Sequence, residues 1–191
     1  WDDDETNDEQ WPYRVKFSGT DLLGNVTIPE GDPTDLETSL EVSLDASSES
    51  YPLHTFNLLN NGVMEKIAKA FKLQPSEIAG TTLDAGTVKA DGFSGPADGK
   101  VAVGLTNPDG KVSYAYSANG IGFWIAADGT ASSWGDAPIY YEYDAGGYGL
   151  TVGHNPGHSE KGKTYIIKPT MVYNKGGKLH KAVITIKMKF A

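Results

Sequence analysis

The chain has 191 residues, 39% of them hydrophobic, and a formal net charge of −9 at pH 7. This length fits one domain, or one domain with a small lobe, and it can bury a hydrophobic core without disulfides. The absence of cysteine excludes thiol catalysis and thiolate metal sites, and the acidic charge argues against nucleic acid or an anionic membrane surface as a partner.

Residues 1–12 are predicted to be a flexible acidic tether. They begin WDDDETNDEQ, a run that cannot bury apolar surface, and they end at Pro12. Because the chain opens with Trp rather than Met, we expect that a leading segment has been removed. An acidic tether behind a signal is typical of a surface lipoprotein, so we expect export to the outer membrane, cell surface or periplasm. The membrane would be contacted only through a lipid anchor upstream of this chain.

Residues 13–85 are predicted to form a β/α segment. Alternating apolar and polar side chains predict two strands, and an amphipathic helix and a short second helix follow them. The first helix is expected to be capped by Asn60 or Asn61, and its apolar stripe consists of Val63, Ile67, Ala70 and Phe71. The predicted strands are Tyr13–Phe17 and Leu40–Leu44, and the second helix is Pro75–Ile78.

Residues 86–191 are predicted to form an antiparallel β domain, with one continuous domain over 13–191 as the alternative. Turn residues predict three hairpins, and two further strands, 139–143 and 148–152, lie between the second and the third. The hairpins join Val101–Thr106 to Val112–Tyr116, Ile121–Ala126 to Thr130–Trp134, and Thr164–Tyr173 to Ala182–Phe190. Alternate residues of the last strand are apolar, which predicts one buried and one solvated face.

The predicted fold class is therefore mainly β, with a minor α+β character. The short, hairpin-linked strands favour an antiparallel β-sandwich or a curled sheet. One helical corner is expected near residues 61–80.

Motifs for catalysis or metal binding are weak in this sequence. His154 and His158 would have metal-ligand spacing on a helix, but the Pro-Gly between them prevents one. Asp136, Glu142 and Asp144 could serve a glycosidase only if two carboxyl groups faced each other across a cleft; we expect Asp136 to cap its turn and Glu142 to point off the sheet. Nucleophile-elbow, phosphate-loop and dinucleotide motifs are absent. No catalytic residue, metal site or cofactor is expected.

The aromatic residues between positions 122 and 143 are the most specific feature of the chain. Trp124 and Trp134 are predicted on opposite arms of one hairpin, and tyrosines follow at 140, 141 and 143. Aromatic rings pack on the C–H faces of sugars, and nearby carboxyl, amide or imidazole groups can bond hydroxyls, so the stretch could be a saccharide platform. The alternative is a buried core, which is favoured for Trp124 and stays open for Trp134.

The run from Gly122 to Phe190 resembles an uncharacterised domain family of exported and surface proteins of Bacteroidetes-type bacteria. The residues that carry this resemblance are Gly122-Phe123-Trp124, Asp128-Gly129, Trp134-Gly135-Asp136, Gly153-x-x-Pro156-Gly157 and Gly162-x-Thr164-Tyr165, with the lysine-rich last strand and the helical piece 67–78. The resemblance implies an extracytoplasmic β-rich module, often in proteins linked to glycan use, and it brings no catalytic residues. The chain departs from the family pattern at His154-Asn155, where a Gln or Tyr is common after the glycine.

We therefore expect a non-catalytic cell-surface module of an exported lipoprotein that binds glycan. One alternative is a protein-interaction or structural accessory domain of a surface complex, which would dock through a sheet face or edge. A further alternative, a glycoside hydrolase, needs two facing carboxyl groups. The expected ligand contacts are Trp134, Asp136, Tyr140, Glu142, His154 and Asn155.

Overall fold

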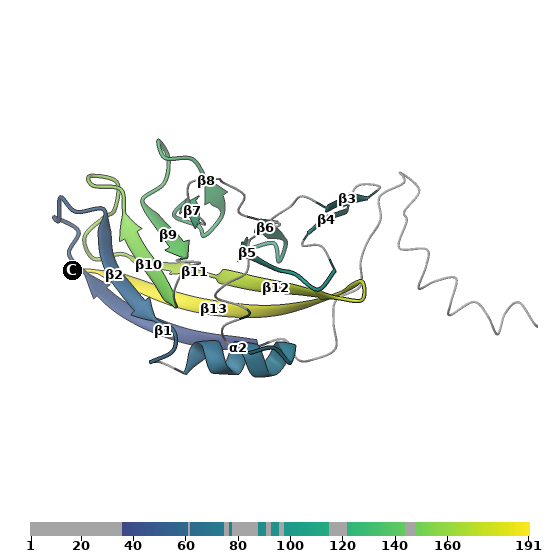
Figure 1. Cartoon of the computed structure of the whole chain (residues 1–191). Coiled ribbons are helices and arrows are strands. Elements are labelled where there is room, and N and C mark those ends of the chain that lie inside the picture. Colours follow the sequence, from purple (N-terminus) through teal and green to yellow (C-terminus); the bar gives the residue numbers. More distant parts are fainter. Residues whose placement is uncertain are drawn as a thin grey trace, which may run out of the picture.

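Two β-sheets that share one hydrophobic core form the fold (Figure 1). A computed structural model describes residues 36–60, 62–74, 77, 88–90, 93–95, 98–114, 122–143 and 148–191. The six-stranded sheet has the order β1 (Leu36–Leu44), β13 (Lys178–Phe190), β12 (Pro169–Lys175), β5 (Val101–Thr106) and β6 (Val112–Tyr114), and β11 (Thr164–Ile167) also pairs with β13. The five-stranded sheet has the order β2 (Pro52–Asn57), β10 (Gly149–His154), β9 (Ile139–Tyr143), β7 (Gly122–Ile125) and β8 (Ala131–Ser132). The described elements also include a ribbon of β3 (Val88–Ala90) and β4 (Phe93–Gly95) and the helix α2 (Val63–Phe71).

The mainly β class with one helical corner is confirmed, and neither sheet is closed or curled. The predicted hairpins appear as β5–β6, β7–β8 and β12–β13. The tether 1–12 and the predicted strand Tyr13–Phe17 lie outside the described residues, as do all residues of the predicted second helix except Glu77. No helix in the described part of the chain is long and apolar enough to cross a bilayer.

Strand β13 is the central element of the six-stranded sheet. It pairs in parallel with β1, from Leu36 opposite Ala182 to Leu44 opposite Phe190, and antiparallel with β12 and β11. These last two strands keep one register against β13, so together they form one arm of the third hairpin. The turn of that hairpin is Gly176-Gly177, where both residues have positive φ angles of 60° and 84°, a conformation that glycine adopts without steric cost.

The core lies between the two sheets. From β13 it receives the alternate residues Ala182, Ile184, Ile186, Met188 and Phe190, all buried as predicted. From the five-stranded sheet it receives Ile125, Ile139, Tyr141, Leu150 and Val152. The hydroxyl of the buried Tyr141 donates a hydrogen bond across the core to the carbonyl of Gly104 in β5, and burial raises the pKa of Tyr141 well above its usual range.

Helix α2 covers the core at the edge of the sheets, and its N-terminus differs from the prediction. Asn60 is not the cap: Gly62 occupies the cap position with φ 68°, and no side chain bonds there. The first helical N–H groups, of Val63 and Met64, donate instead to the carbonyl of Leu58 at 2.8 and 3.2 Å, which satisfies donors that a side-chain cap would otherwise serve. Asn61 lies outside the described residues. The buried face consists of Val63, Met64, Ile67, Ala68 and Phe71, with Ala70 partly exposed.

The outer face of the six-stranded sheet is solvated only in part. At the C-terminal end of β13, Lys187 and Lys189 pair with Glu41 of β1 at 3.7 and 3.1 Å. The hydrogen bond and charge of Lys189 lower the pKa of the Glu41 carboxyl. Toward the Gly176-Gly177 turn, outward residues such as Val172 and Ala102 are buried. The predicted solvated face is therefore correct at the C-terminal end of β13 and wrong toward the turn, where Val172 and Ala102 are buried beside the half-buried Lys181.

Tyr141→Phe tests the bond that joins the sheets. The ring stays in the core but its donor is lost, so we expect the free energy of unfolding to fall by about 1 kcal/mol in urea denaturation followed by circular dichroism. Tyr141→Ala, which also leaves a cavity, should cost roughly 3–5 kcal/mol. A Tyr141→Phe variant as stable as the parent would show that the hydrogen bond adds nothing.

Candidate functional site

The outer face of the five-stranded sheet carries a cluster of aromatic rings. In β9 the side chains of Ile139, Tyr141 and Tyr143 are buried, and strand alternation directs Tyr140 and Glu142 to the opposite face. Tyr140 lies opposite Trp124 of β7, with 5.0 Å between ring centroids. Tyr51, the residue before β2, packs edge-to-face with Trp124, with 6.4 Å between the ring centroids. We call Tyr51, Trp124 and Tyr140 the aromatic row, because it runs across the strands.

Gly153 of β10 makes room for this row. It lies opposite Tyr140 in the register. A Cβ atom added at Gly153 would stand 2.4 Å from Cε1 of Tyr140 and 2.0 Å from the carbonyl oxygen of Tyr51. Both distances are far below van der Waals contact. Glycine therefore allows the Tyr140 ring to lie directly over the backbone of β10.

A polar row lies beside the aromatic row on the same face. It consists of Thr55, Thr151 and Glu142, which the register aligns across β2, β10 and β9. The two threonine hydroxyls share a hydrogen bond of 2.8 Å. Glu142 is exposed and lies opposite Gly122, which offers no side chain to cover it. Along β9 the two rows are two residues apart, at Tyr140 and Glu142, or roughly 7 Å.

The hydroxyl of Tyr140 and the carboxylate of Glu142 have complementary hydrogen-bonding roles. Burial raises the pKa of Tyr140, and the negative charge of Glu142 raises it further. The phenol therefore stays protonated at neutral pH and can donate, while the carboxylate can only accept. Such a face can bond hydroxyl groups of a ligand that lies on the rings.

Trp134 and Asp136 occupy the turn that leads into β9. Asp136 closes this turn as expected: its N–H donates to the carbonyl of Ser133 at 3.1 Å, and its carboxylate accepts from the Ser133 hydroxyl at 3.2 Å. The side chain of Trp134 is 58% exposed. Of the two alternatives left open for this residue, surface and core, the surface position is therefore correct. The core interpretation of Trp124 is wrong, because alternation in β7 gives the inner positions to Phe123 and Ile125.

The structure places His154 and Asn155 away from the two rows. His154 lies opposite Ile139 on the inner side of the sheet, where it is fully buried and its ring stacks on Phe190 at 5.6 Å. Its Nε2 lies 3.0 Å from the carbonyl of Ser48, and its Nδ1 shares a hydrogen bond with the hydroxyl of Ser159. Both ring nitrogens are thus engaged within the protein.

Asn155 supports the turn that carries Trp134. Its side-chain amide donates to the carbonyl of Trp134 at 2.8 Å, and its backbone N–H donates to the carbonyl of Pro138 at 3.0 Å. It is buried. Asn155 therefore acts on the site by holding the turn, and a surface ligand does not reach it.

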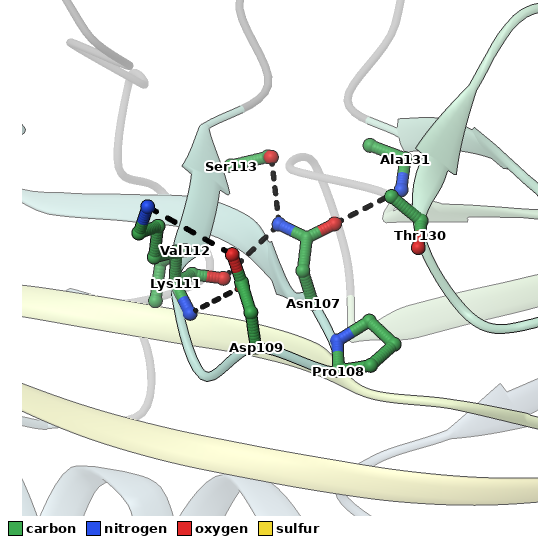
Figure 2. Close-up of a pocket in the computed structure, with 8 residues that line it drawn as sticks. All are labelled: Asn107, Pro108, Asp109, Lys111, Val112, Ser113, Thr130 and Ala131. Carbon is green, nitrogen blue, oxygen red and sulfur yellow. Dashed lines mark hydrogen bonds and ion pairs between the residues drawn. The ribbon is translucent and has the colours of Figure 1, made fainter.

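A pocket of about 500 Å³ lies between two hairpin turns (Figure 2). Its wall is formed by Asn107, Pro108, Asp109, Lys111, Val112, Ser113, Thr130 and Ala131. The Asn107 amide donates to the carbonyl of Lys111 and the hydroxyl of Ser113, and it accepts the N–H of Ala131 at 3.0 Å. The amide N–H groups therefore bond within their own hairpin and the amide oxygen joins that hairpin to β8, so every group of this amide is engaged within the protein. Sequence reasoning identified this turn but not its role in joining the two sheets.

The remaining candidate metal ligands and carboxylates do not form a cluster in the described part of the chain. Within the described residues there is no group of three or more His, Asp or Glu side chains that could hold a metal ion. His158 is exposed, and its Nδ1 lies 3.3 Å from the carbonyl of Pro156. Asp144 lies outside the described residues.

The fold and the outer face define a two-sheet β domain with a solvent-facing aromatic row. The chain belongs to a family described as a domain of unknown function (DUF4859), whose model matches residues 50–178. The match includes every strand of the five-stranded sheet and confirms the expected membership of an uncharacterised family. No curated protein and no solved structure shows significant similarity to the chain.

Gly153→Ala tests the close packing of Tyr140 and the Tyr51 backbone against Gly153. The new methyl group must displace Tyr140 and the Tyr51 backbone, so we expect a loss of roughly 1–3 kcal/mol in unfolding free energy and a changed near-ultraviolet circular dichroism spectrum. Gly135→Ala is the matched control, because nothing lies within 4 Å of a Cβ there. Equal effects of the two substitutions would refute the proposed close approach.

Asn155→Ala tests the support of the Trp134 turn. Loss of the amide should cost about 1 kcal/mol of stability and speed hydrogen exchange at the Asp136 and Ala137 amides, which bond to Ser133. His158→Ala, on the same loop but without a bond to the turn, should leave that exchange unchanged. Unaltered exchange in Asn155→Ala would mean that the turn holds its shape without it.

Proposed function

We propose that this protein is a non-catalytic glycan-binding module. The observation that carries the proposal is the aromatic row of Tyr51, Trp124 and Tyr140 on the outer face of the five-stranded sheet, with Glu142 beside it. Trp134 adds an exposed indole in the turn before β9. Single exposed aromatic residues are common on protein surfaces, and the contact of several with each other supports an interaction site here.

The chemistry of the two rows suits a sugar chain. Aromatic rings pack against the C–H faces of pyranose rings with little loss of side-chain entropy, because the rings already contact each other. Tyr140 can donate to a hydroxyl group and Glu142 can accept from one. Thr55 and Thr151 already bond each other, so both can accept from a ligand and one of them can still donate. A glycan that lies along the aromatic row would turn one edge of hydroxyl groups toward the polar row.

The arrangement supports binding better than hydrolysis. A glycosidase needs two carboxyl groups roughly 5–10 Å apart across a cleft. The described strands of the five-stranded sheet contain one carboxylate, Glu142, and it lies on an open face. Asp136 bonds within its own turn. We therefore keep glycoside hydrolysis outside the proposal.

We also propose that the module belongs to an exported lipoprotein at the cell surface. The support is the acidic N-terminal run and the resemblance to surface proteins of Bacteroidetes-type bacteria. Protease treatment of intact cells tests this placement: the module should be cleaved without lysis, together with known surface proteins. Protection until lysis would place it elsewhere.

Trp124→Ala and Tyr140→Ala test the binding function. A panel of soluble plant, microbial and host glycans is first screened by the change in intrinsic tryptophan fluorescence, and hits are measured by calorimetry. Each substitution should weaken binding at least tenfold, or about 1.4 kcal/mol, while circular dichroism shows an intact fold. Trp134→Ala tests the indole in the turn in the same way.

The matched control for these variants is Ile166→Ala, because Ile166 is an exposed apolar residue of the other sheet. Its binding should equal that of the parent. A flat response across the panel would reject the proposal and shift weight to the alternative, a protein-interaction domain that docks through the same face. Capture of partners on the parent but not on Tyr140→Ala would then support that alternative.

A further inference from the structure

Charge is divided between the two sheets. The described strands of the five-stranded sheet contain no lysine and no arginine. Strands β12 and β13 alone contain five lysines: Lys175, Lys178, Lys181, Lys187 and Lys189. The two histidines of the five-stranded sheet, His54 and His154, lie opposite Val152 and Ile139, so both are on the inner side. The outer face with the aromatic row thus has Glu142 as the one charged side chain of its described strands.

Two lysines that lie near this sheet along the chain, Lys163 and Lys111, already pair with acids. Lys163, in the connection after β10, bonds Glu160 at 2.8 Å. Hydrogen bonds from Ser47 and, to a smaller extent, the charge of Lys161 lower the pKa of Asp45. Lys111, near β8, is 3.9 Å from Asp109.

Turns around the five-stranded sheet add negative charge. Asp45 and Glu49 lie before β2, Asp128 lies between β7 and β8, and Asp136 lies before β9. None of these carboxylates pairs with a cation within the described ion pairs. The whole chain also carries a net charge of −9. An anion that approaches the aromatic row therefore meets repulsion, and the described strands of this sheet supply no lysine or arginine to offset it.

Acidic glycans are bound through cationic side chains, and the described strands of this face contain none. Carboxylate and sulfate groups are held in proteins chiefly by arginine and lysine. A glycan carboxylate about 4 Å from Glu142 would instead be repelled by about 1 kcal/mol in bulk water and by about 4 kcal/mol at the effective dielectric of a protein surface. Hydroxyl groups carry no such penalty, and they suit the acceptor Glu142 and the donor Tyr140.

We infer that the ligand of the aromatic row is a glycan free of carboxylate and sulfate groups, and that Glu142 excludes acidic glycans. This inference rests on the proposed function and names the ligand class of the same site. The ligand class distinguishes the aromatic row from the lysine-rich side of the six-stranded sheet. An acidic polymer could bind weakly to those lysines at low salt without reaching the aromatic row.

The test is competition between polysaccharides that share a backbone. The pairs are hydroxyethylcellulose with carboxymethylcellulose, dextran with dextran sulfate, and methyl-esterified polygalacturonan with polygalacturonate. The neutral member is bound first, and its displacement is measured at constant ionic strength. Competition reports only on the shared site, so binding of acidic polymers to lysines elsewhere does not register. We expect the acidic member to fail as a competitor, even in large excess.

Glu142→Lys should reverse this preference. The acidic member should then displace its neutral partner at a concentration at least tenfold lower than with the parent, and high salt should remove the gain because exposed charges are screened. Glu65→Lys, the same charge change at an exposed position of α2, is the matched control and should behave as the parent does.

The outcomes separate the two proposals. If none of the neutral polysaccharides binds, here or in the wider panel, the proposed function fails and this inference fails with it. If the acidic members displace their neutral partners equally well from the parent, glycan binding stands and the charge inference is wrong. If Glu142→Lys gains nothing over Glu65→Lys, Glu142 is not the residue that excludes acidic glycans.

Discussion

The alternation of side chains along β13 is the constraint on which the rest of the structure depends. Over its C-terminal half every second residue is a buried apolar side chain that meets the five-stranded sheet, while its backbone pairs with β1 on one edge and with β11 and β12 on the other. Each fully buried aliphatic side chain contributes roughly 1.5–3 kcal/mol. A shift of one residue would bring Lys187 and Lys189 into the core, so the register has one favourable solution.

The same rule in the five-stranded sheet explains why the expected ligand contacts separate. Tyr140 and Glu142 are outward residues of β9, whereas His154 is an inward residue of β10 and Asn155 follows it. Proximity in sequence suggested one cluster, but strand direction sends the side chains to opposite faces. Asn155 serves the site indirectly because it holds the turn of Trp134, whereas His154 fills the core against Phe190.

Much of the fold follows from local sequence, and the rest depends on distant contacts. Hairpins such as β5–β6 could be predicted because Asn-Pro-Asp-Gly encodes its own turn. The parallel pairing of β1 with β13 could not, because its partners lie far apart in the chain and no short loop records the register. Tyr51 escaped notice as part of the site for a similar reason: its contact with Trp124 exists only once β2, β10, β9 and β7 are side by side. The cap of α2 was predicted wrongly because a backbone carbonyl, that of Leu58, replaced the expected side chain.

Glycines allow the outer aromatic rings to pack against each other and form one continuous surface. Outward positions beside the rows are occupied by Gly122 and Gly153, whose added Cβ atoms would collide with the neighbouring strand or ring. Because neither position has a side chain, the Tyr140 ring can lie over the strand backbone and contact the Trp124 ring. Trp124 in turn contacts the Tyr51 ring. Rings that immobilise each other have little conformational freedom left to lose when a ligand arrives. The aromatic row is therefore organised before binding, and the glycines of β7 and β10 contribute to recognition although neither offers a side chain to a ligand.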